Sequence, residues 1–128
     1  MQKTARLISP IGMRSTYEWW LMADKKHLEI AKRGTEAIEK WREANPDRPL
    51  NLSGADLRRA ELAHANLTGA DLHEANLEWA DLRWADLMNA DLSGANLTMA
   101  DFHKADLSRA NLRRADLIRA NLEERYSQ

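Results

Sequence analysis

The sequence contains no cysteine, only three prolines and one phenylalanine, and no long apolar run. Without cysteine the chain can form no disulfide framework and offers no thiolate metal ligands. No stretch approaches the roughly 20 apolar residues of a membrane-spanning helix, so we expect no membrane contact. The first residues, MQKTARLISPIGMR, make a poor signal peptide because a proline interrupts the short apolar stretch. A cytoplasmic protein is the default prediction, although the lack of cysteine is equally compatible with other compartments.

The charges nearly cancel, with 19 Lys and Arg against 20 Asp and Glu in 128 residues. A chain this close to neutrality lacks the basic surface that binds nucleic acid, so we expect no direct nucleic-acid binding. The sequence shows no motif of a catalytic nucleophile and no phosphate-binding glycine loop. His64, His73 and His103 have no metal-ligand spacing, so we expect no metal and no cofactor.

A five-residue sequence repeat makes up more than half of the chain. From Ala55 to Ala120 alanine recurs at every fifth position, followed by Asp or Asn (once Glu61) and then by Leu (once Phe102). An earlier unit has Leu50 in the alanine slot, so residues 50–124 make fifteen consecutive units. An internal repeat decides the fold before any other pattern does.

A period of five fits neither an ordinary helix nor a straight strand. Five residues turn an α-helix by about 500°, so successive leucines would wind around the axis and form no stripe. On a straight strand an odd period would send alternate leucines to opposite faces. The period is explained if the chain turns once per unit, so that every leucine points at a common axis. Four corners close a square of twenty residues, and coils stacked at about 4.8 Å can pair their backbones like parallel strands.

Each unit also carries residues that favour turns. Asp and Asn hydrogen-bond to their own backbone, and Gly54, Gly69 and Gly94 supply a permissive backbone at the fifth position. The repeat resembles the pentapeptide-repeat family, whose pattern of Ala, Asp or Asn, Leu and two variable residues is matched by ADLRR, ANLTG, ADLHE and the units onward to ANLEE. The resemblance implies an all-β solenoid, namely a right-handed four-sided parallel β-helix of about four coils. We expect an α-helix to cap its N-terminus.

Before the repeats the apolar period changes to that of a helix. Residues 24–49 predict an amphipathic capping helix, with Asp24 as its N-cap, and a connector with two prolines. The apolar face of this helix consists of Ile30, Gly34, Ile38 and Trp41. Residues 1–23 form an N-terminal segment in which STYE matches a capping box before Trp19 and Trp20, predicting a second, short helix.

Five apolar side chains occupy outward slots where polar ones are expected: Trp79, Trp84, Met88, Met99 and Ile118. In a twenty-residue coil Trp79 and Met99 share a column, Ile118 lies on the same side, and Trp84 is one corner away. Such exposed groups mark a contact, and tryptophan is a frequent interface anchor. Two interpretations stay open: a protein partner binds this surface, or the segment with Trp19 and Trp20 covers it.

These observations favour a non-enzymatic protein-protein interaction or scaffold module with an unknown partner. The column of Glu61, Asp81 and Asp101 suggests a carboxylate pair, but turn-forming residues on a solvated wall explain it more simply. The family resemblance offers an alternative, a DNA-mimicking binder that inhibits or protects a topoisomerase such as gyrase. Residues 50–128 carry 13 acidic and 9 basic side chains, which is a weak match to a duplex with one negative charge per roughly 1.7 Å.

After Leu122 the repeat breaks, and residues 125–128 form a tail. The end of the last coil then presents an apolar surface that only Tyr126 can cover. This surface consists of Leu107, Leu112, Leu117 and Leu122. An open coil end with unpaired backbone groups invites pairing with another chain. We therefore expect a homodimer joined through the C-terminal coils, and the competing prediction is a monomer whose tail folds back over the leucines.

Overall fold

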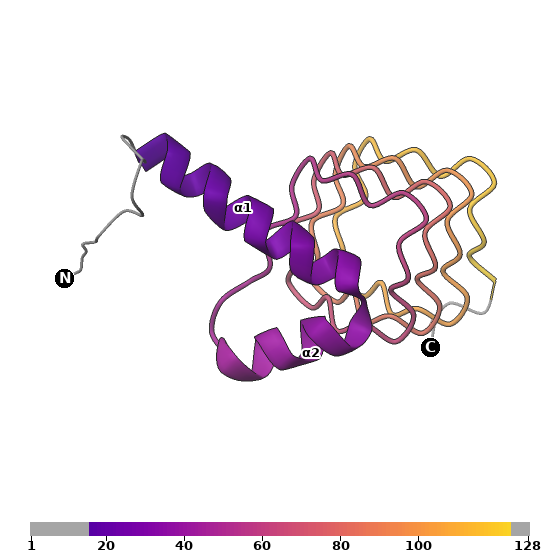
Figure 1. Cartoon of the computed structure of the whole chain (residues 1–128). Coiled ribbons are helices and arrows are strands. Elements are labelled where there is room, and N and C mark those ends of the chain that lie inside the picture. The colour runs from indigo at the N-terminus through magenta and orange to yellow at the C-terminus, as the bar shows by residue number, and fades with distance from the viewer. Residues whose placement is uncertain (1–15, 124–128) are drawn as a thin grey trace.

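A computed structural model describes residues 16–123, with side chains from residue 25 onward. The chain begins with two helices, α1 (Thr16–Arg33) and α2 (Thr35–Ala44), and continues as a coil of repeated square turns. Figure 1 shows the helices lying against the first of the stacked turns. The side chains of Trp19 and Trp20, and all of Tyr126, lie outside the described residues, so the predictions that involve them are not addressed.

The break between the helices differs from the predicted one. We expected a helix to start at Asp24, but α1 begins at Thr16 and runs through that residue. The chain leaves the helix at Gly34, whose φ of 102° lies in the region that favours glycine. Gly34 is therefore not part of a continuous capping-helix face. It is the hinge that lets α2 turn away from α1, as Figure 1 shows.

Parallel bridges connect residues twenty positions apart and define four walls. Among the described residues these bridges are isolated, so each wall contributes a single bridged residue and no extended strand. Strands stay this short because a turn follows every bridged residue after one intervening leucine. The Asp, Asn or Glu slots stack into four columns: Asn51–Asp71–Asp91–Asn111, Asp56–Asn76–Asn96–Asp116, Glu61–Asp81–Asp101–Asn121 and Asn66–Asp86–Asp106.

Every backbone N–H of a middle unit has an acceptor, as the unit 75–79 illustrates. The alanine N–H donates to the Leu72 carbonyl in the preceding turn, and the asparagine N–H donates to the Ala55 carbonyl of the coil before. The N–H groups of the leucine and of the fifth residue donate to the carbonyls of Asn96 and Thr98 in the coil after. The N–H of the fourth residue donates to Oδ1 of Asn76, and all five distances are 2.8–3.1 Å. The repeat thus satisfies its backbone without long strands.

The corners require a left-handed backbone at the fifth position of the unit. There φ is positive in the three glycines Gly54, Gly69 and Gly94 and also in eleven other residues. The leucine carbonyl accepts the N–H of the next alanine across each corner, as in a type II turn, whose third residue has φ above zero. Non-glycine residues there cost about 1 kcal/mol or more each. The corner geometry therefore overrides local preference, and side chains as large as tryptophan occupy it.

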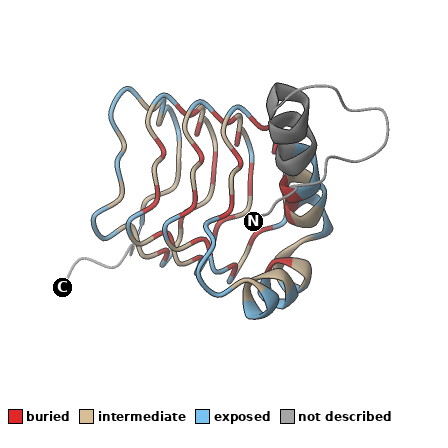
Figure 2. Cartoon of the chain, turned by 90° about the vertical axis from the view of Figure 1, so that its left-hand side faces the viewer, coloured by how far each residue is buried: buried red, intermediate tan, exposed pale blue. Residues whose placement is uncertain are grey.

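The leucines of the first three turns form the core. Leu52, Leu57, Leu62 and Leu82 are at most 1% exposed, and Phe102 fills a leucine slot with no exposure. In the last described turn the leucines are only partly buried, and Figure 2 shows no buried segment there. A leucine at the same position of the repeat is therefore buried or partly exposed, depending on whether another turn or a helix covers it.

Side chains of α1 and α2 contact the first turn. Ala31 and Ile38 are fully buried in the same core cluster as the leucines. Thr35 donates its hydroxyl to the Ala63 carbonyl at 2.6 Å. Arg42 donates from Nε to the Asn66 carbonyl at 2.7 Å and from Nη2 to the Thr68 carbonyl. Because these bonds end on backbone carbonyls, they depend on the geometry of the coil rather than on its variable side chains.

Candidate interaction surface

Trp79 stands at a corner between two walls and is stacked within its own column. Its side chain is 48% exposed, and its φ is 63°. The guanidinium of Arg59, one coil earlier, lies 5.5 Å from the ring centroid, a cation–π contact. Met99, one coil later, is half-buried. The ring is therefore oriented by its column while much of its surface stays open to solvent.

Trp84 occupies the next corner and is held in the same way. The residue is 51% exposed, and its ring lies parallel to that of His64, with an interplanar angle of 5° and centroids 5.9 Å apart. From the other side Lys104 Nζ approaches to 5.0 Å from the ring centroid. Trp79 and Trp84 are thus two half-exposed indoles at the corners that bound the third wall.

The other three predicted patch residues are placed differently. Ile118 is 62% exposed, and its carbonyl accepts the Met99 N–H, so it lies beside the Trp79 column. Met88 is half-buried and belongs to the fourth wall, where its carbonyl accepts the Gly69 N–H. The structure therefore brings Trp79, Met99 and Ile118 to one side, places Trp84 at the adjacent corner, and leaves Met88 on another wall.

The carboxylate column between the two indoles does not have the features of an acid–base pair. Arg83 donates from Nε and Nη2 to both oxygens of Asp81, at 2.8 and 2.7 Å. This hydrogen bond lowers the pKa of Asp81 below its usual range. A catalytic acid at neutral pH needs the opposite shift. Asp81 therefore suits a turn on a solvated wall better than proton transfer.

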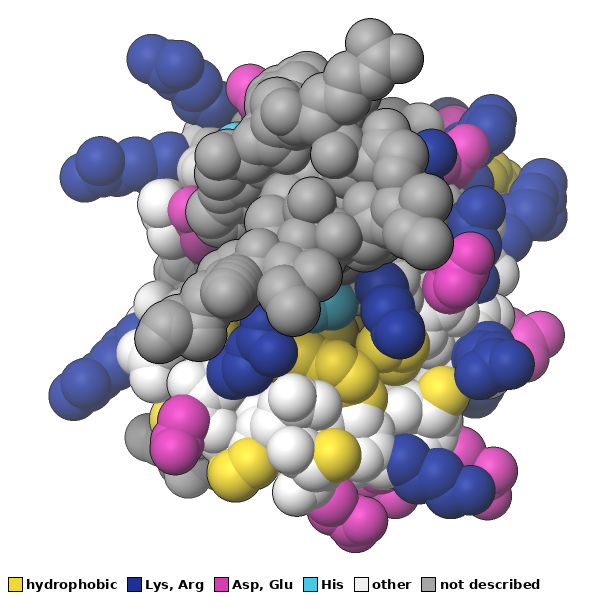
Figure 3. All heavy atoms as spheres, turned by 60° about the vertical axis from the view of Figure 1, so that its left-hand side comes forward, with side chains coloured by type: hydrophobic (Ala, Val, Ile, Leu, Met, Phe, Trp, Pro, Cys, Tyr) yellow, Lys and Arg dark blue, Asp and Glu magenta, His cyan; other side chains and the backbone are white. Residues whose placement is uncertain are grey.

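A second arginine–carboxylate pair sits near the end of α1. Arg58 binds Asp56 through two hydrogen bonds of 2.8 Å, and the first of the causes that lower the pKa of Asp56 to about 2 is this side-chain bond. A surface hollow of about 430 Å³ adjoins the pair, and its charged lining includes Lys32, Arg33 and Arg59. Figure 3 shows basic and acidic side chains interspersed over the face of the molecule that it presents. The hollow is lined by both signs of charge and joins the Trp79 column through Arg59.

His27 was missed by sequence reasoning although it links three parts of the chain. Its side chain is buried on α1, and its ring meets that of Trp41 edge to face, with centroids 4.9 Å apart. Its Nδ1 accepts the backbone N–H of Asn51 at 2.8 Å. A histidine at a helical position carries no local signal for such a bond, because the acceptor role depends on where the first turn passes.

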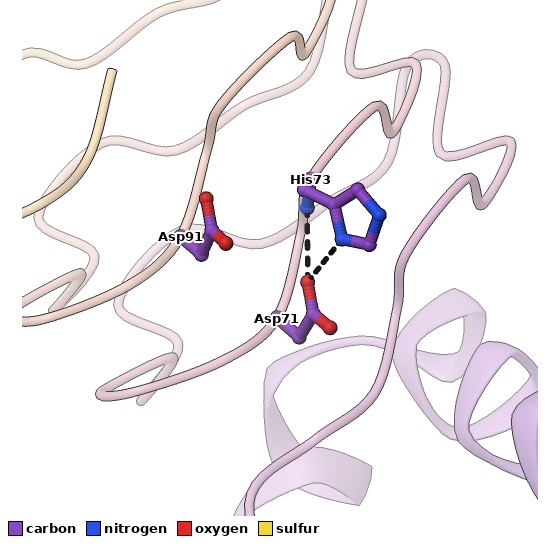
Figure 4. A group of neighbouring side chains, drawn as sticks. All are labelled: Asp71, His73 and Asp91. Carbon is purple, nitrogen blue, oxygen red and sulfur yellow. Dashed lines mark hydrogen bonds and ion pairs between the residues drawn. The ribbon is translucent and has the colours of Figure 1, made fainter. Parts of the chain in front are cut away.

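A third group, also missed, combines a histidine with two stacked carboxylates (Figure 4). Asp71 and Asp91 are bridged neighbours in one column, and His73 follows Asp71 by two residues. One ligand atom from each lies within 4.8 Å of the others. The hydrogen bond of Asp71 raises the pKa of His73. A histidine two residues after an aspartate, with another aspartate twenty residues later, is the sequence signal that would have found this group.

Backbone pairing every twenty residues and leucines turned toward one axis define a repeat protein whose units stack on one another. The family model for pentapeptide repeats matches residues 51–87 and 85–123, with eight copies. The chain therefore belongs to the pentapeptide-repeat family, as the sequence predicted. Proteins of this family form right-handed quadrilateral β-helices. A comparison with curated proteins found no match.

Solved pentapeptide-repeat proteins resemble the chain. HetL, involved in heterocyst differentiation regulation in the cyanobacterium Nostoc sp. strain PCC 7120, is 49% identical over 57% of this chain, with a TM-score of 0.55. This chain spans only 34% of HetL. A second protein from Nostoc PCC 7120 is 36% identical over 68% of this chain and 74% of its own, with a TM-score of 0.38. One from the Arabidopsis thaliana thylakoid lumen is 29% identical over 61% of this chain and 65% of its own, with a TM-score of 0.31.

Among the described residues, neither helix is long and apolar enough to cross a membrane. α1 has 18 residues, but charged side chains interrupt it throughout its second half.

Proposed function

We propose that this protein is a non-enzymatic interaction module built as a right-handed quadrilateral β-helix of about four coils. In this proposal α1 and α2 form its N-terminal cap, because their side chains enter the core and bind carbonyls of the first turn. The walls carry the binding surface. A cytoplasmic location and the absence of catalysis are parts of the same proposal.

The observation that carries the proposal is the pair of half-exposed indoles, Trp79 and Trp84, at the corners of the third wall. The fold itself gives no reason for tryptophan there, because a corner with positive φ favours glycine or asparagine. Stacking on Arg59, and on His64 and Lys104, fixes both rings before any partner arrives. Rigid aromatic anchors lose little entropy on binding, which is why they dominate interface energetics.

The test is affinity capture from the native host with the wild-type chain and with a Trp79→Ser/Trp84→Ser double variant. We expect at least one protein to be retained by the wild type and lost with the double variant. Met88→Ser, on another wall, is the matched control and should retain it. Binding of the isolated partner should then change the tryptophan fluorescence of the wild type. Retention of every captured protein by the double variant would contradict a binding role for the indoles.

The alternative function is a DNA-mimicking ligand of a topoisomerase such as gyrase. Stacked aspartates that form no salt bridge with Lys or Arg among the described residues, such as Asp71 above Asp91 and Asp86 above Asp106, support it. The arginine pairs at Asp56 and Asp81 oppose it, because they neutralise two of the four columns locally. We expect no inhibition of gyrase supercoiling and no protection from a quinolone. Inhibition that weakens with salt and disappears in an Asp86→Asn/Asp106→Asn variant would favour the mimic.

We further propose that two copies join through the last coil. The leucines of that coil, Leu107, Leu112, Leu117 and Leu122, are only partly buried among the described residues. A two-fold contact would cover both undersides at once. Light scattering behind size exclusion should report a dimer for the wild type and a monomer for Leu117→Gln. A wild type of monomer mass at every concentration would instead support the folded-back tail.

A further inference from the structure

We propose that Asp71, His73 and Asp91 bind a divalent first-row transition-metal ion on the first wall of the coil. This site is separate from the indole corners and does not depend on the proposed interaction function. Figure 4 shows the imidazole directed at the Asp71 carboxylate, with the Asp91 carboxylate on the adjacent turn facing the same space. The three side chains come from two turns that the backbone bridge between Asp71 and Asp91 holds side by side.

The distances suit coordination with small side-chain movements. His73 Nδ1 lies 2.8 Å from Asp71 Oδ1, and one atom of each of the three residues falls within 4.8 Å of the others. In a tetrahedral Zn²⁺ site with bonds of about 2.0–2.1 Å, ligand atoms lie about 3.3 Å apart. The observed pair is close to that spacing, the third ligand atom lies within 4.8 Å and has to move closer, and water can fill the remaining position of this half-exposed site.

The charges favour a cation at this place. Two aspartates stack here in successive turns, and like charges placed opposite each other on neighbouring strands are destabilising. Among the described residues neither Asp71 nor Asp91 contacts a lysine or arginine, whereas Asp56 and Asp81 each bind an arginine. At this pair the partner from the same turn is the His73 imidazole, which bonds to Asp71 at 2.8 Å and can itself serve as a metal ligand.

Hydrogen bonds from Ser93 and Asn111 hold Asp91 in place. Its Oδ1 accepts the backbone N–H and the hydroxyl of Ser93, at 3.0 and 2.6 Å, and the amide of Asn111 at 3.4 Å. Among the described residues these bonds all go to Oδ1, which leaves Oδ2 available to a ligand. Such outer hydrogen bonds fix the orientation of metal-binding carboxylates. Metal binding through His73 Nδ1 would require the ring proton to lie on Nε2, and the metal bond would replace the hydrogen bond to Asp71.

The donor set indicates the class of metal. An imidazole nitrogen suits Zn²⁺, Ni²⁺, Cu²⁺ and iron, while carboxylates alone suit Mg²⁺, Ca²⁺ and Mn²⁺. A site with one nitrogen and two carboxylates therefore prefers Zn²⁺ over Mg²⁺, and this preference depends on His73.

The chain contains its own control. His103 follows Asp101 by two residues, as His73 follows Asp71. In the next turn, however, the position below Asp101 is Asn121, whose amide donates to Asp101 Oδ1 at 3.0 Å. The aspartate above, Asp81, is occupied by Arg83. His103 thus has an aspartate in its own turn and an asparagine in the next one, where His73 has two aspartates.

The test is a Zn²⁺ titration of the full chain, followed by calorimetry and by the histidine ring resonances in NMR. We expect one high-affinity site that shifts the ring resonances of His73 and leaves those of His103 unchanged until the site is full. His73→Gln and Asp91→Asn should each weaken Zn²⁺ binding by at least about tenfold, the lower end of the loss seen when even outer-shell partners are removed. His103→Gln should leave the affinity unchanged.

The variants test binding rather than folding. Asparagine is the natural residue at equivalent slots such as Asn66 and Asn96, where its Oδ1 accepts the same turn N–H. Asp91→Asn should therefore keep the thermal midpoint, which is measured for each variant. Zn²⁺ affinity unaffected by His73→Gln, equal loss with His103→Gln, or Mg²⁺ binding as tight as Zn²⁺ would each overturn the proposal.

Discussion

The two ends of the coil have the same five-residue repeat but differ in how far its leucines are buried. Leu62 in the first turn and Leu122 in the last described turn occupy one column of the third wall. Leu62 is fully buried, and Leu122 is only partly buried. At the first end, α1 and α2 add Ala31 and Ile38 to the core. The repeat therefore makes a wall, while covering an end of the coil requires a different element.

The ends also differ in how their backbone groups are satisfied. At the first end, side chains of the helices bind the coil: Thr35 and Arg42 donate to its carbonyls, and His27 accepts an N–H. At the other end, within residues 16–123, the Leu112 and Leu117 amides have no turn beyond them to bind. Polar backbone at a coil end therefore needs partners as much as the leucines need cover.

The largest effect is expected in the middle of the column, where both neighbours are present. Leu82→Asp places an unpaired carboxylate in the core between two turns. The cost should exceed the whole stability of a domain, about 5–15 kcal/mol. We expect loss of the folded far-ultraviolet dichroism spectrum. The exposed neighbour Arg83→Gln should change the free energy of unfolding by less than about 1 kcal/mol, and a folded Leu82→Asp protein would contradict the assigned core.

Matched truncations at the two ends test the comparison directly. Leu62→Ala should lower the free energy of unfolding by about 2–5 kcal/mol, because it leaves a cavity under the helices. Leu122→Ala should cost about 1 kcal/mol, because its side chain is already partly solvated. Urea unfolding measures both. If two copies cover Leu122, its cost will grow with protein concentration, whereas equal and concentration-independent costs would show that the last coil is sealed within one chain.

The contribution of the helices is tested at His27. Replacing it by alanine removes the acceptor of the Asn51 N–H and the edge contact with Trp41. An unsatisfied buried donor costs about 1–3 kcal/mol, so we expect a loss of about 2 kcal/mol. The control is Lys26→Ala, at an exposed position beside it on α1. Hydrogen exchange should show faster opening of the first turn in the His27 variant only, and equal rates would argue against the link.

The smallest effect concerns the salt bridge of the first turn. The side-chain bond from Arg58 lowers the pKa of Asp56 to about 2. A depressed folded-state pKa stabilises the fold above the unfolded value of about 3.9, and this contribution is lost as pH falls toward 2. An NMR titration of the carboxyl should show a midpoint near 2, rising in Arg58→Gln. In the last turn Ile118 occupies the repeat position of Arg58, so Asp116 has no arginine two residues after it. An unchanged midpoint would assign the shift to the backbone bond.

Much of the coil could be predicted from the sequence because its signal is local and repeated. Leu82 points inward for the same reason as every other leucine, and one period suffices to place it. Gly34 was misplaced because an apolar pattern counts glycine as compatible with a helical face, while its φ of 102° ends the helix. The His73 group escaped notice because its third member, Asp91, is distant in the chain and adjacent only in the stack.

Local sequence explains the period of the corners, the inward leucines and the Asx residues that bind the turn amides, since each depends on contacts within a few residues. Tertiary packing decides which leucines are buried, which aspartates stack on one another and which indoles lie against cations. These outcomes depend on what lies one turn above or below, twenty residues away. Burial and stacking are properties of neighbouring layers, so identical units acquire different environments in the stack.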